Sequence, residues 1–343
     1  MYLLHYTNFF LFFCSGRETA SLHLVVSSIL CRFIPALAYM TNKIPSMKPT
    51  PQLFSRRSAL KAMAAGTGAV MATDLFKHAA AAEKAAAEPL KGRINHSVCR
   101  WCYPSIPLAS LCEAAKEIGI TAIDLVGPDE WAVLKQYGLH AAMSHGAGKG
   151  ISQGFNDPTL HDELVASYEN LIPQVAAAGY DQLICFSGNR RGLDDEEGIL
   201  HCATGLKRLM GTAEQHGVTL VMELLNSKVD HPDYQCDHTA WGAALCDAVG
   251  SDRFKLLYDI YHMQIMEGDI IATIRKYHSY IAHYHTGGVP GRNEIDETQE
   301  LHYPAIMSAI VETGFKGYVA QEFIPKQPEP LKSLAQAISI CDV

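Results

Sequence analysis

The sequence predicts an α/β protein with the (β/α)8 architecture of a TIM barrel, on the strength of three observations. From residue 94 onward, short apolar runs alternate with amphipathic segments, eight of each over about 250 residues, the length expected of such a barrel. The runs are continuously apolar, as parallel strands buried on both faces should be. The alternative, a doubly wound open sheet, normally carries a Gly-rich phosphate turn after its first strand. Here the first run ends in Cys99-Arg100-Trp101-Cys102-Tyr103-Pro104, without glycine.

The individual elements follow from periodicity and from end signals. Short apolar runs predict strands at residues 94–102, 122–126, 140–144, 182–186, 219–224, 254–260, 281–285 and 318–323. Apolar residues at helical spacing predict helices at residues 108–118, 130–136, 160–178, 196–216, 238–249, 269–277, 303–313 and 331–340. Glycines directly follow several of these helices, as at Gly119, Gly179 and Gly217, and glycine readily adopts the left-handed conformation that ends a helix.

The composition is that of an ordinary globular protein. Of the 343 residues, 48% are hydrophobic and 19% are charged, which is enough apolar material for a large core. The formal net charge of −8 argues against a general nucleic-acid-binding surface, so we expect no nucleic acid among its partners. The pair Cys99-x-x-Cys102 has redox or zinc spacing, but no second such pair completes a zinc site, and no functional role is predicted for it.

The first 90 residues differ from the rest and are predicted to be a leader, followed by a TIM-barrel domain over residues 91–343. Neither apolar patch within residues 1–39 is the long uncharged run that a membrane-spanning helix needs. A start of translation at Met40 or Met47 would remove that segment altogether.

A second feature of the leader is Arg56-Arg57, which precedes a mildly apolar run and then an Ala-rich stretch. This order resembles a bacterial twin-arginine export signal, and the alternative is a basic, Ala-rich disordered leader. The resemblance implies a periplasmic or otherwise exported protein with no stable membrane association after export.

Four predicted strands end in residues of metal-binding type. Glu223, Asp259, His285 and Glu322 stand at the C-terminal ends of the fifth to eighth strands. In a barrel these ends surround one mouth, where the active site lies. Three carboxylates and one imidazole suit a divalent ion, Mn²⁺ or Mg²⁺ first and Co²⁺ or Zn²⁺ as alternatives. The competing interpretation is four unrelated surface or salt-bridged side chains, which four equivalent positions disfavour.

Several segments together resemble the hydroxypyruvate isomerase group of the xylose isomerase-like sugar isomerase/epimerase superfamily. The matching segments are Ile94 to Cys102 (Ile-Asn-His-Ser-Val-Cys-Arg-Trp-Cys), Met222-Glu223, Asp259-Ile260-Tyr261-His262 and Pro290-Gly291-Arg292-Asn293-Glu294. The resemblance extends over residues 94–326. Its most specific parts are the Asp-x-x-His segment and the segment around Arg292.

The resemblance implies that Glu223 and Glu322 are both metal ligands and the acid/base pair, and that Asp259 and His285 complete the metal sphere. One departure is His285, since hydroxypyruvate isomerases tend to have Gln there whereas ketose epimerases have His. A second departure is residues 299–303, Gln-Glu-Leu-His-Tyr, where the isomerases show a Gly-Glu-Ile-Asn-Tyr-like run.

Three further residues are candidates for contact with a substrate. The resemblance places His262 on a substrate oxygen and Arg292 on a substrate carboxylate or hydroxyl. A bidentate arginine fork suits a carboxylate well. His145 ends the third predicted strand, where it points into the mouth or belongs to a loop. Trp101 and Tyr103 are candidates for an apolar wall of the site, or for simple packing.

The function expected is a metal-dependent, hydroxypyruvate isomerase-like enzyme acting on a small hydroxy-oxo acid or sugar through an enediolate. The alternatives are a ketose 3-epimerase and a non-catalytic sugar-binding barrel. An endonuclease IV-like phosphodiesterase of the same superfamily would need a basic DNA-binding face, which this acidic chain does not favour. The expected partner is a small-molecule substrate. The sequence does not decide whether the protein forms a homo-oligomer.

Overall fold

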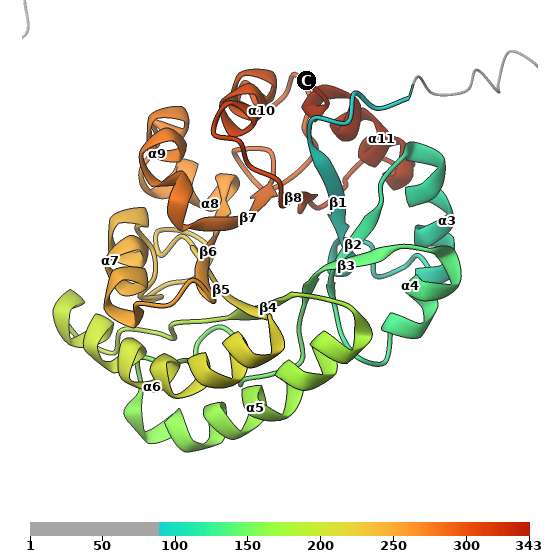
Figure 1. Ribbon diagram of the computed structural model, residues 1–343. Coiled ribbons are helices and arrows are strands. Elements are labelled where there is room, and N and C mark those ends of the chain that lie inside the picture. Colours follow the sequence, from blue (N-terminus) through green and yellow to red (C-terminus); the bar gives the residue numbers. More distant parts are fainter. Residues whose placement is uncertain (1–88) are drawn as a thin grey trace, which may run out of the picture. The chain divides into compact units, whose positions relative to one another are not determined.

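The computed structural model describes residues 89–343, which form a closed parallel barrel (Figure 1). The strands pair in chain order, and β8 pairs with β1 to close the ring. They are β1 (Asn95–Cys99), β2 (Ala122–Val126), β3 (His140–Ser144), β4 (Gln182–Cys185), β5 (Thr219–Glu223), β6 (Phe254–Asp259), β7 (Ile281–Thr286) and β8 (Tyr318–Gln321). The predicted (β/α)8 fold is confirmed. The predicted leader, residues 1–90, lies outside the described residues except for its last two.

Helices surround the ring of strands in Figure 1. The α-helices are α3 (Leu108–Ile118), α4 (Trp131–Tyr137), α5 (His161–Ala178), α6 (Asp195–His216), α7 (Thr239–Val249), α8 (Ile260–Met266), α9 (Ile270–Tyr277), α10 (Tyr303–Glu312) and α11 (Pro330–Cys341). Short 3-10 helices are η2 (Arg100–Cys102), η3 (Pro158–Leu160) and η4 (His278–Tyr280). The predicted glycine ends of α3, α5 and α6 are confirmed, because each C-cap is a left-handed glycine.

The structure differs from the predicted elements mainly just after the strands. β1 stops at Cys99, because Arg100–Cys102 turns into η2 instead of continuing the strand. Helix α8, which the sequence did not predict, begins directly after β6. The Asp259 side chain caps it by accepting a hydrogen bond from the backbone N–H of His262 (3.1 Å). Seven residues are too few for a helical period to stand out in the sequence.

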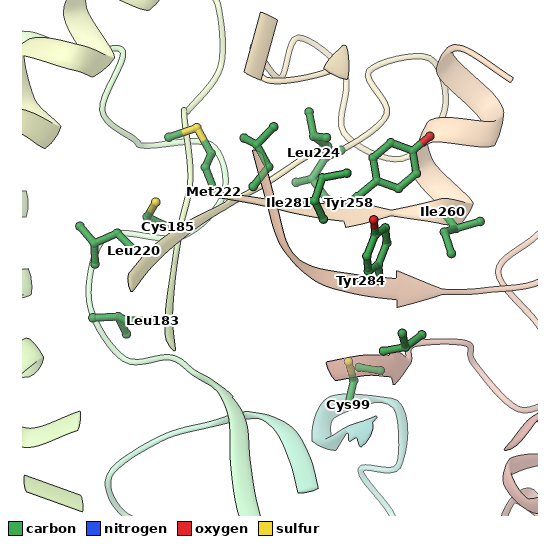
Figure 2. Packing of buried hydrophobic residues seen from close by; sticks show 14 of the residues in the cluster. Cys99, Leu183, Cys185, Leu220, Met222, Leu224, Tyr258, Ile260, Ile281 and Tyr284 are labelled. Atoms are coloured by element: carbon green, nitrogen blue, oxygen red, sulfur yellow. The ribbon is translucent and has the colours of Figure 1, made fainter. Parts of the chain in front are cut away.

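Alternate residues of each strand face different layers. In β5, Leu220 and Met222 belong to the large core that the helices cover, and Figure 2 shows them near Leu183 and Cys185 of β4. Val221 between them belongs to a smaller buried cluster inside the barrel. That cluster is completed by Met143, Ile184 and Leu257. Because both faces of the strands are buried, the sequence shows continuous apolar runs instead of an alternating pattern.

The eight cysteines among the described residues are buried and unpaired, so they pack as small hydrophobic side chains. Within residues 89–343, no helix has both the length and the apolarity that crossing a membrane requires.

Candidate active site

The C-terminal ends of β5 to β8 bring the four predicted ligands together. Ligand-type atoms of Glu223, Asp259, His285 and Glu322 all lie within 4.8 Å of one another, and all four side chains are buried. The strand register explains part of this, since Asp259 pairs directly with His285 across β6 and β7. Glu322 follows the last residue of β8. The geometry is the predicted one, and the role of these residues as metal ligands stays a prediction.

The two glutamates are held differently. Glu322 accepts hydrogen bonds on both oxygens, from the Trp101 indole N–H at 2.7 Å and from His285 Nδ1 at 2.7 Å. Oε1 of Glu223 lies 3.3 Å from the same imidazole nitrogen but has no hydrogen-bond partner. Burial opposes ionisation of Glu322, yet the charges of Arg292 and His285 hold its pKa well below the usual range. Burial and the charge of Glu322 raise the pKa of Glu223.

Arg292 supplies a positive charge to the cluster. Its guanidinium forms an ion pair with Glu322 and a second one with Asp259 (3.2 Å). It also lies over two aromatic rings, 5.2 Å from the ring centroid of Trp101 and 5.3 Å from that of Tyr261. The same side chain lines the cavity described below. Its predicted contact with a substrate stays a prediction, and that contact would compete with the two carboxylates.

His262 is buried behind the cluster. Its Nδ1 accepts a hydrogen bond from the backbone N–H of Asn226 (3.2 Å), so the ring proton sits on Nε2. Nε2 lies 3.6 Å from Asp259 Oδ2 and has no hydrogen-bond partner. Burial and the charge of Arg292 lower the pKa of His262 well below its usual value, which keeps the ring neutral. A contact with a substrate oxygen stays a prediction, and Nε2–H is the group that would make it.

Asp124 of β2 is a candidate that sequence reasoning missed. Its Oδ2 lies 2.6 Å from His283 Nε2, and its Oδ1 lies 3.5 Å from His285 Nε2. Burial alone would raise its pKa, but the two histidines outweigh burial and lower the pKa to about 2. Asp124 Oδ1 has no hydrogen-bond partner, but it faces His285 at the ring nitrogen opposite the one that faces the glutamates, and its role in orienting that ring is a prediction. The sequence feature that could have identified it was a single Asp inside an otherwise apolar predicted strand, residues 122–126.

A cavity of about 590 Å³ opens onto the cluster. Glu223, Glu322 and Arg292 line it on the side of the cluster, together with His231, whose ring packs against that of His262 at a centroid distance of 5.2 Å. His145 lines the cavity as well, with an exposed ring in the loop after β3. His145 thus shares the predicted site but does not belong to the cluster.

Trp101 combines two roles, of which the sequence indicated one. It lines the cavity as the predicted apolar wall. In addition, its indole N–H binds Glu322, which the sequence did not predict because Trp101 and Glu322 are 221 positions apart.

The residues of the cluster fit a divalent cation. Three buried carboxylates repel one another at such short range, and burial raises the pKa of Asp259 well above its usual range although Arg292 opposes this. A cation among them would remove this penalty and give the unpartnered Glu223 Oε1 a ligand. Carboxylate and imidazole donors suit Mn²⁺, Mg²⁺, Co²⁺ and Zn²⁺, and nothing in the donor set selects one of them.

Comparison with known proteins identifies the family. Residues 112–340 match the family described as xylose isomerase-like TIM barrel. This chain belongs to that family. The predicted resemblance to the hydroxypyruvate isomerase group is confirmed as well. A Homo sapiens protein named as a hydroxypyruvate isomerase is 31% identical over 233 residues, which cover 66% of this chain and 78% of the relative.

Other proteins are similar over shorter stretches or in fold alone. A 2-oxo-tetronate isomerase of Cupriavidus necator is 34% identical over 114 residues, covering 33% of this chain and 43% of the relative. The crystal structure of an AP endonuclease, family 2, from Brucella melitensis superposes with a TM-score of 0.64 at 24% identity, covering 71% of this chain and 98% of that one. The relatives similar in sequence are named as isomerases, as predicted.

The expected export by the twin-arginine route is wrong on this comparison. The relatives include proteins named as hydroxypyruvate isomerases from Homo sapiens, Mus musculus and Drosophila melanogaster, and not exported bacterial proteins. The expectation rested on Arg56-Arg57 and the Ala-rich run after it, which lie outside the described residues. Such a pattern is short and compositional, so it also arises in a leader of another kind.

Proposed function

We propose that this protein is a metal-dependent, hydroxypyruvate isomerase-like enzyme that exchanges a carbonyl group with the neighbouring hydroxyl group in a small hydroxy-oxo acid or sugar. The supporting observation is the convergence of Glu223, Asp259, His285 and Glu322 beside the cavity, in a family whose relatives are named as isomerases. Residues 91–343 form the proposed catalytic domain.

The four clustered residues would hold one divalent cation. When bound, the cation supplies Lewis-acid polarisation of the substrate carbonyl and orients the neighbouring hydroxyl. His285 offers Nδ1, because its other ring nitrogen faces Asp124. His262 directs Nε2–H toward the cluster, where it can donate to a substrate oxygen.

Glu223 is the proposed group that moves the proton. The reaction removes a proton from one carbon and returns it to the next, through an enediolate of the substrate. Glu223 lines the cavity, and its Oε1 has no hydrogen-bond partner. One oxygen of this carboxylate would hold the cation, and the other would accept the proton. Glu322 accepts a hydrogen bond from the Trp101 indole N–H and forms an ion pair with Arg292, so its proposed role is to hold charge more than to carry the proton.

Deuterium exchange tests this proposal. The full chain is loaded with Mn²⁺ and incubated in D₂O with hydroxypyruvate, 2-oxo-tetronate and a panel of ketoses, and proton NMR follows deuterium entering the carbon next to the carbonyl. We expect exchange together with isomerised product. Exchange at C3 of a ketose with inversion would instead identify an epimerase. Tight binding of metal and ligand without any exchange would identify a binding protein.

The matched variants are Glu223→Gln and Glu196→Gln. Loss of the proton-transfer group should slow exchange by about 10²–10⁴-fold. Glu196 is exposed on α6, so its replacement should leave exchange unchanged. Equal rates for the two variants would rule out Glu223 as the base.

A further inference from the structure

The cavity has two chemically different halves. The strands that carry the cluster, β5 to β8, occupy one side of the closed ring, and β2 to β4 occupy the other. On that second side the lining side chains are mainly apolar. They are Leu125, Ile151, Ile184 and Phe186, with Leu225 between the halves. The exposed ring of His145 at the rim is the exception.

Leu125 is held in this wall by an unusual backbone. It has a φ of 54°, in the left-handed region that a leucine rarely adopts inside a strand. The pairing of β2 with β3 shifts register on both sides of Asp124, so β2 bulges at this point. The bulge lets Asp124 reach His283 inside the barrel while the next residue, Leu125, faces the cavity. A strained backbone that delivers an apolar side chain to a cavity indicates a function for that side chain.

The cavity is also larger than the smallest candidate substrate. Hydroxypyruvate has seven non-hydrogen atoms. If each takes roughly 30 Å³, the volume of one water molecule in the liquid, the molecule fills about 200 Å³. The cavity holds about 590 Å³. A polyhydroxylated chain in the remaining space would place hydroxyl groups against Leu125, Ile184 and Phe186, which offer them no hydrogen bonds. An apolar group would fill the same space without that penalty.

We infer that the substrate is a 2-hydroxy carbonyl compound with an apolar substituent, an aryl or branched alkyl group, on the side away from the cluster. This inference rests on the proposed isomerase function and names its substrate class. The reacting carbons lie against Glu223 and Arg292, and the substituent lies against Leu125 and Phe186. The chemistry balances without a further reactant. The C–H bond at the hydroxyl-bearing carbon breaks, a C–H bond forms at the former carbonyl carbon, and the hydroxyl proton moves to the other oxygen.

Three related acids test the inference on the Mn²⁺-loaded full chain. They are hydroxypyruvate, 3,4-dihydroxy-2-oxobutanoate and 3-hydroxy-2-oxo-4-phenylbutanoate. We expect kcat/KM for deuterium exchange to be at least about 10-fold higher for the phenyl compound than for the dihydroxy compound, a typical discrimination by an apolar pocket. Calorimetry with 2-oxo-4-phenylbutanoate and 2-oxobutanoate, which lack the reacting hydroxyl, should show the same preference in Kd.

The variant that tests the wall is Leu125→Asn. Asn has the same number and branching of side-chain heavy atoms as Leu and tolerates a positive φ, so the bulge should persist. Leu125→Asn should lower the ratio of kcat/KM for the phenyl compound to kcat/KM for the dihydroxy compound by about 10-fold or more. Phe186→Ser, at a second position of the wall, should lower the same ratio. This second variant keeps the test valid if one of the two variants fails to fold. Leu200→Asn, at a position 64% exposed on α6, should leave the ratio unchanged.

The outcomes separate this inference from the proposed function. Exchange on hydroxypyruvate without preference for the phenyl compounds, in turnover or in Kd, overturns the inference and leaves the isomerase function standing. No exchange on any of the three acids overturns the inference, and the isomerase function falls with it if the ketose panel shows no exchange either. A preference that Leu125→Asn and Phe186→Ser do not reduce overturns the assignment of the wall.

Discussion

Two side chains of the cluster, both proposed cation ligands, are held in place by hydrogen bonds of their own. Asp259 caps α8 through Oδ1 while Oδ2 faces Arg292, so the helix cap fixes the orientation of the carboxylate. Glu322 is fixed in the same way by Trp101 and His285. Ligands that are already oriented lose little conformational freedom when a cation binds, which favours binding.

Asp124 is predicted to position His285 for a cation. Asp124→Asn should weaken Mn²⁺ binding about 10- to 100-fold, because the imidazole loses the carboxylate that orients it. Isothermal titration calorimetry measures the Kd directly, and Asp129→Asn, an exposed neighbour, is the control. In a His285→Gln background the Asp124→Asn change should have little further effect. A full effect in that background would show that Asp124 acts by another route.

Glu294 ties the loop that carries Arg292 to the segment before α11 and to α11 itself. Its Oε1 accepts hydrogen bonds from the backbone N–H groups of Lys326 (2.7 Å) and Gln327 (2.8 Å) and from the Ser333 hydroxyl (3.2 Å). Burial works against ionisation, but these hydrogen bonds prevail and lower the pKa of Glu294.

This lowered pKa predicts a pH-dependent stability. A folded-state pKa below the unfolded value of about 4.3 gives stability that is present above that pH and is lost as pH falls through the folded pKa. Glu294→Gln should therefore lower the free energy of unfolding by about 1–2 kcal/mol near pH 7, and the difference from wild type should shrink below about pH 4. Urea unfolding of both proteins across this range is the measurement. A difference that stays constant with pH would contradict the role of the charge.

At the scale of elements, α6 packs so closely that two of its glycines, Gly198 and Gly205, have no room for a side chain. A Cβ on Gly205 would lie 2.9 Å from the ring of His161 and 2.9 Å from that of Phe155, whereas a Cβ on Gly211 of the same helix would meet nothing within 4 Å. The two positions share the helix and differ only in packing. They therefore separate helix propensity from steric fit.

Gly205→Ala and Gly211→Ala should have opposite effects on stability. Gly211→Ala should stabilise by about 0.5–1 kcal/mol, since alanine is the better helix former. Gly205→Ala should destabilise by about 1–3 kcal/mol, since overpacking outweighs that gain. Chemical denaturation at neutral pH checks both. Equal stabilisation by the two changes would mean that α6 can shift away from its neighbours without cost.

At the scale of the whole molecule, a cation at the buried carboxylate cluster is predicted to stabilise the fold. A ligand that binds only the folded state stabilises it by about 2.7 kcal/mol at a free concentration 100-fold above Kd. For a domain of this size that raises Tm by about 5–10 °C. Adding Mn²⁺ to chelator-treated protein should give this shift in calorimetry, and Glu322→Gln should reduce it. No shift with Mn²⁺, Mg²⁺, Co²⁺ or Zn²⁺ would contradict a cation site at the cluster.

By itself, the sequence determined the barrel and the four strand ends that meet at its mouth. Strand and helix periods are local, and a closed parallel barrel necessarily gathers the C-terminal ends of neighbouring strands. Glu223, Asp259 and His285 could thus be grouped before any contact was known.

The tertiary structure alone decided how those groups are held and what shape the cavity has. Trp101 reaches Glu322, Asp124 supports His285, and His262 lies behind His231. These contacts join distant segments through side-chain directions, which no local period records. The apolar wall depends in the same way on a bulge in β2, because a shift of register at Asp124 changes which side chains face the cavity without changing the apolar pattern of the strand.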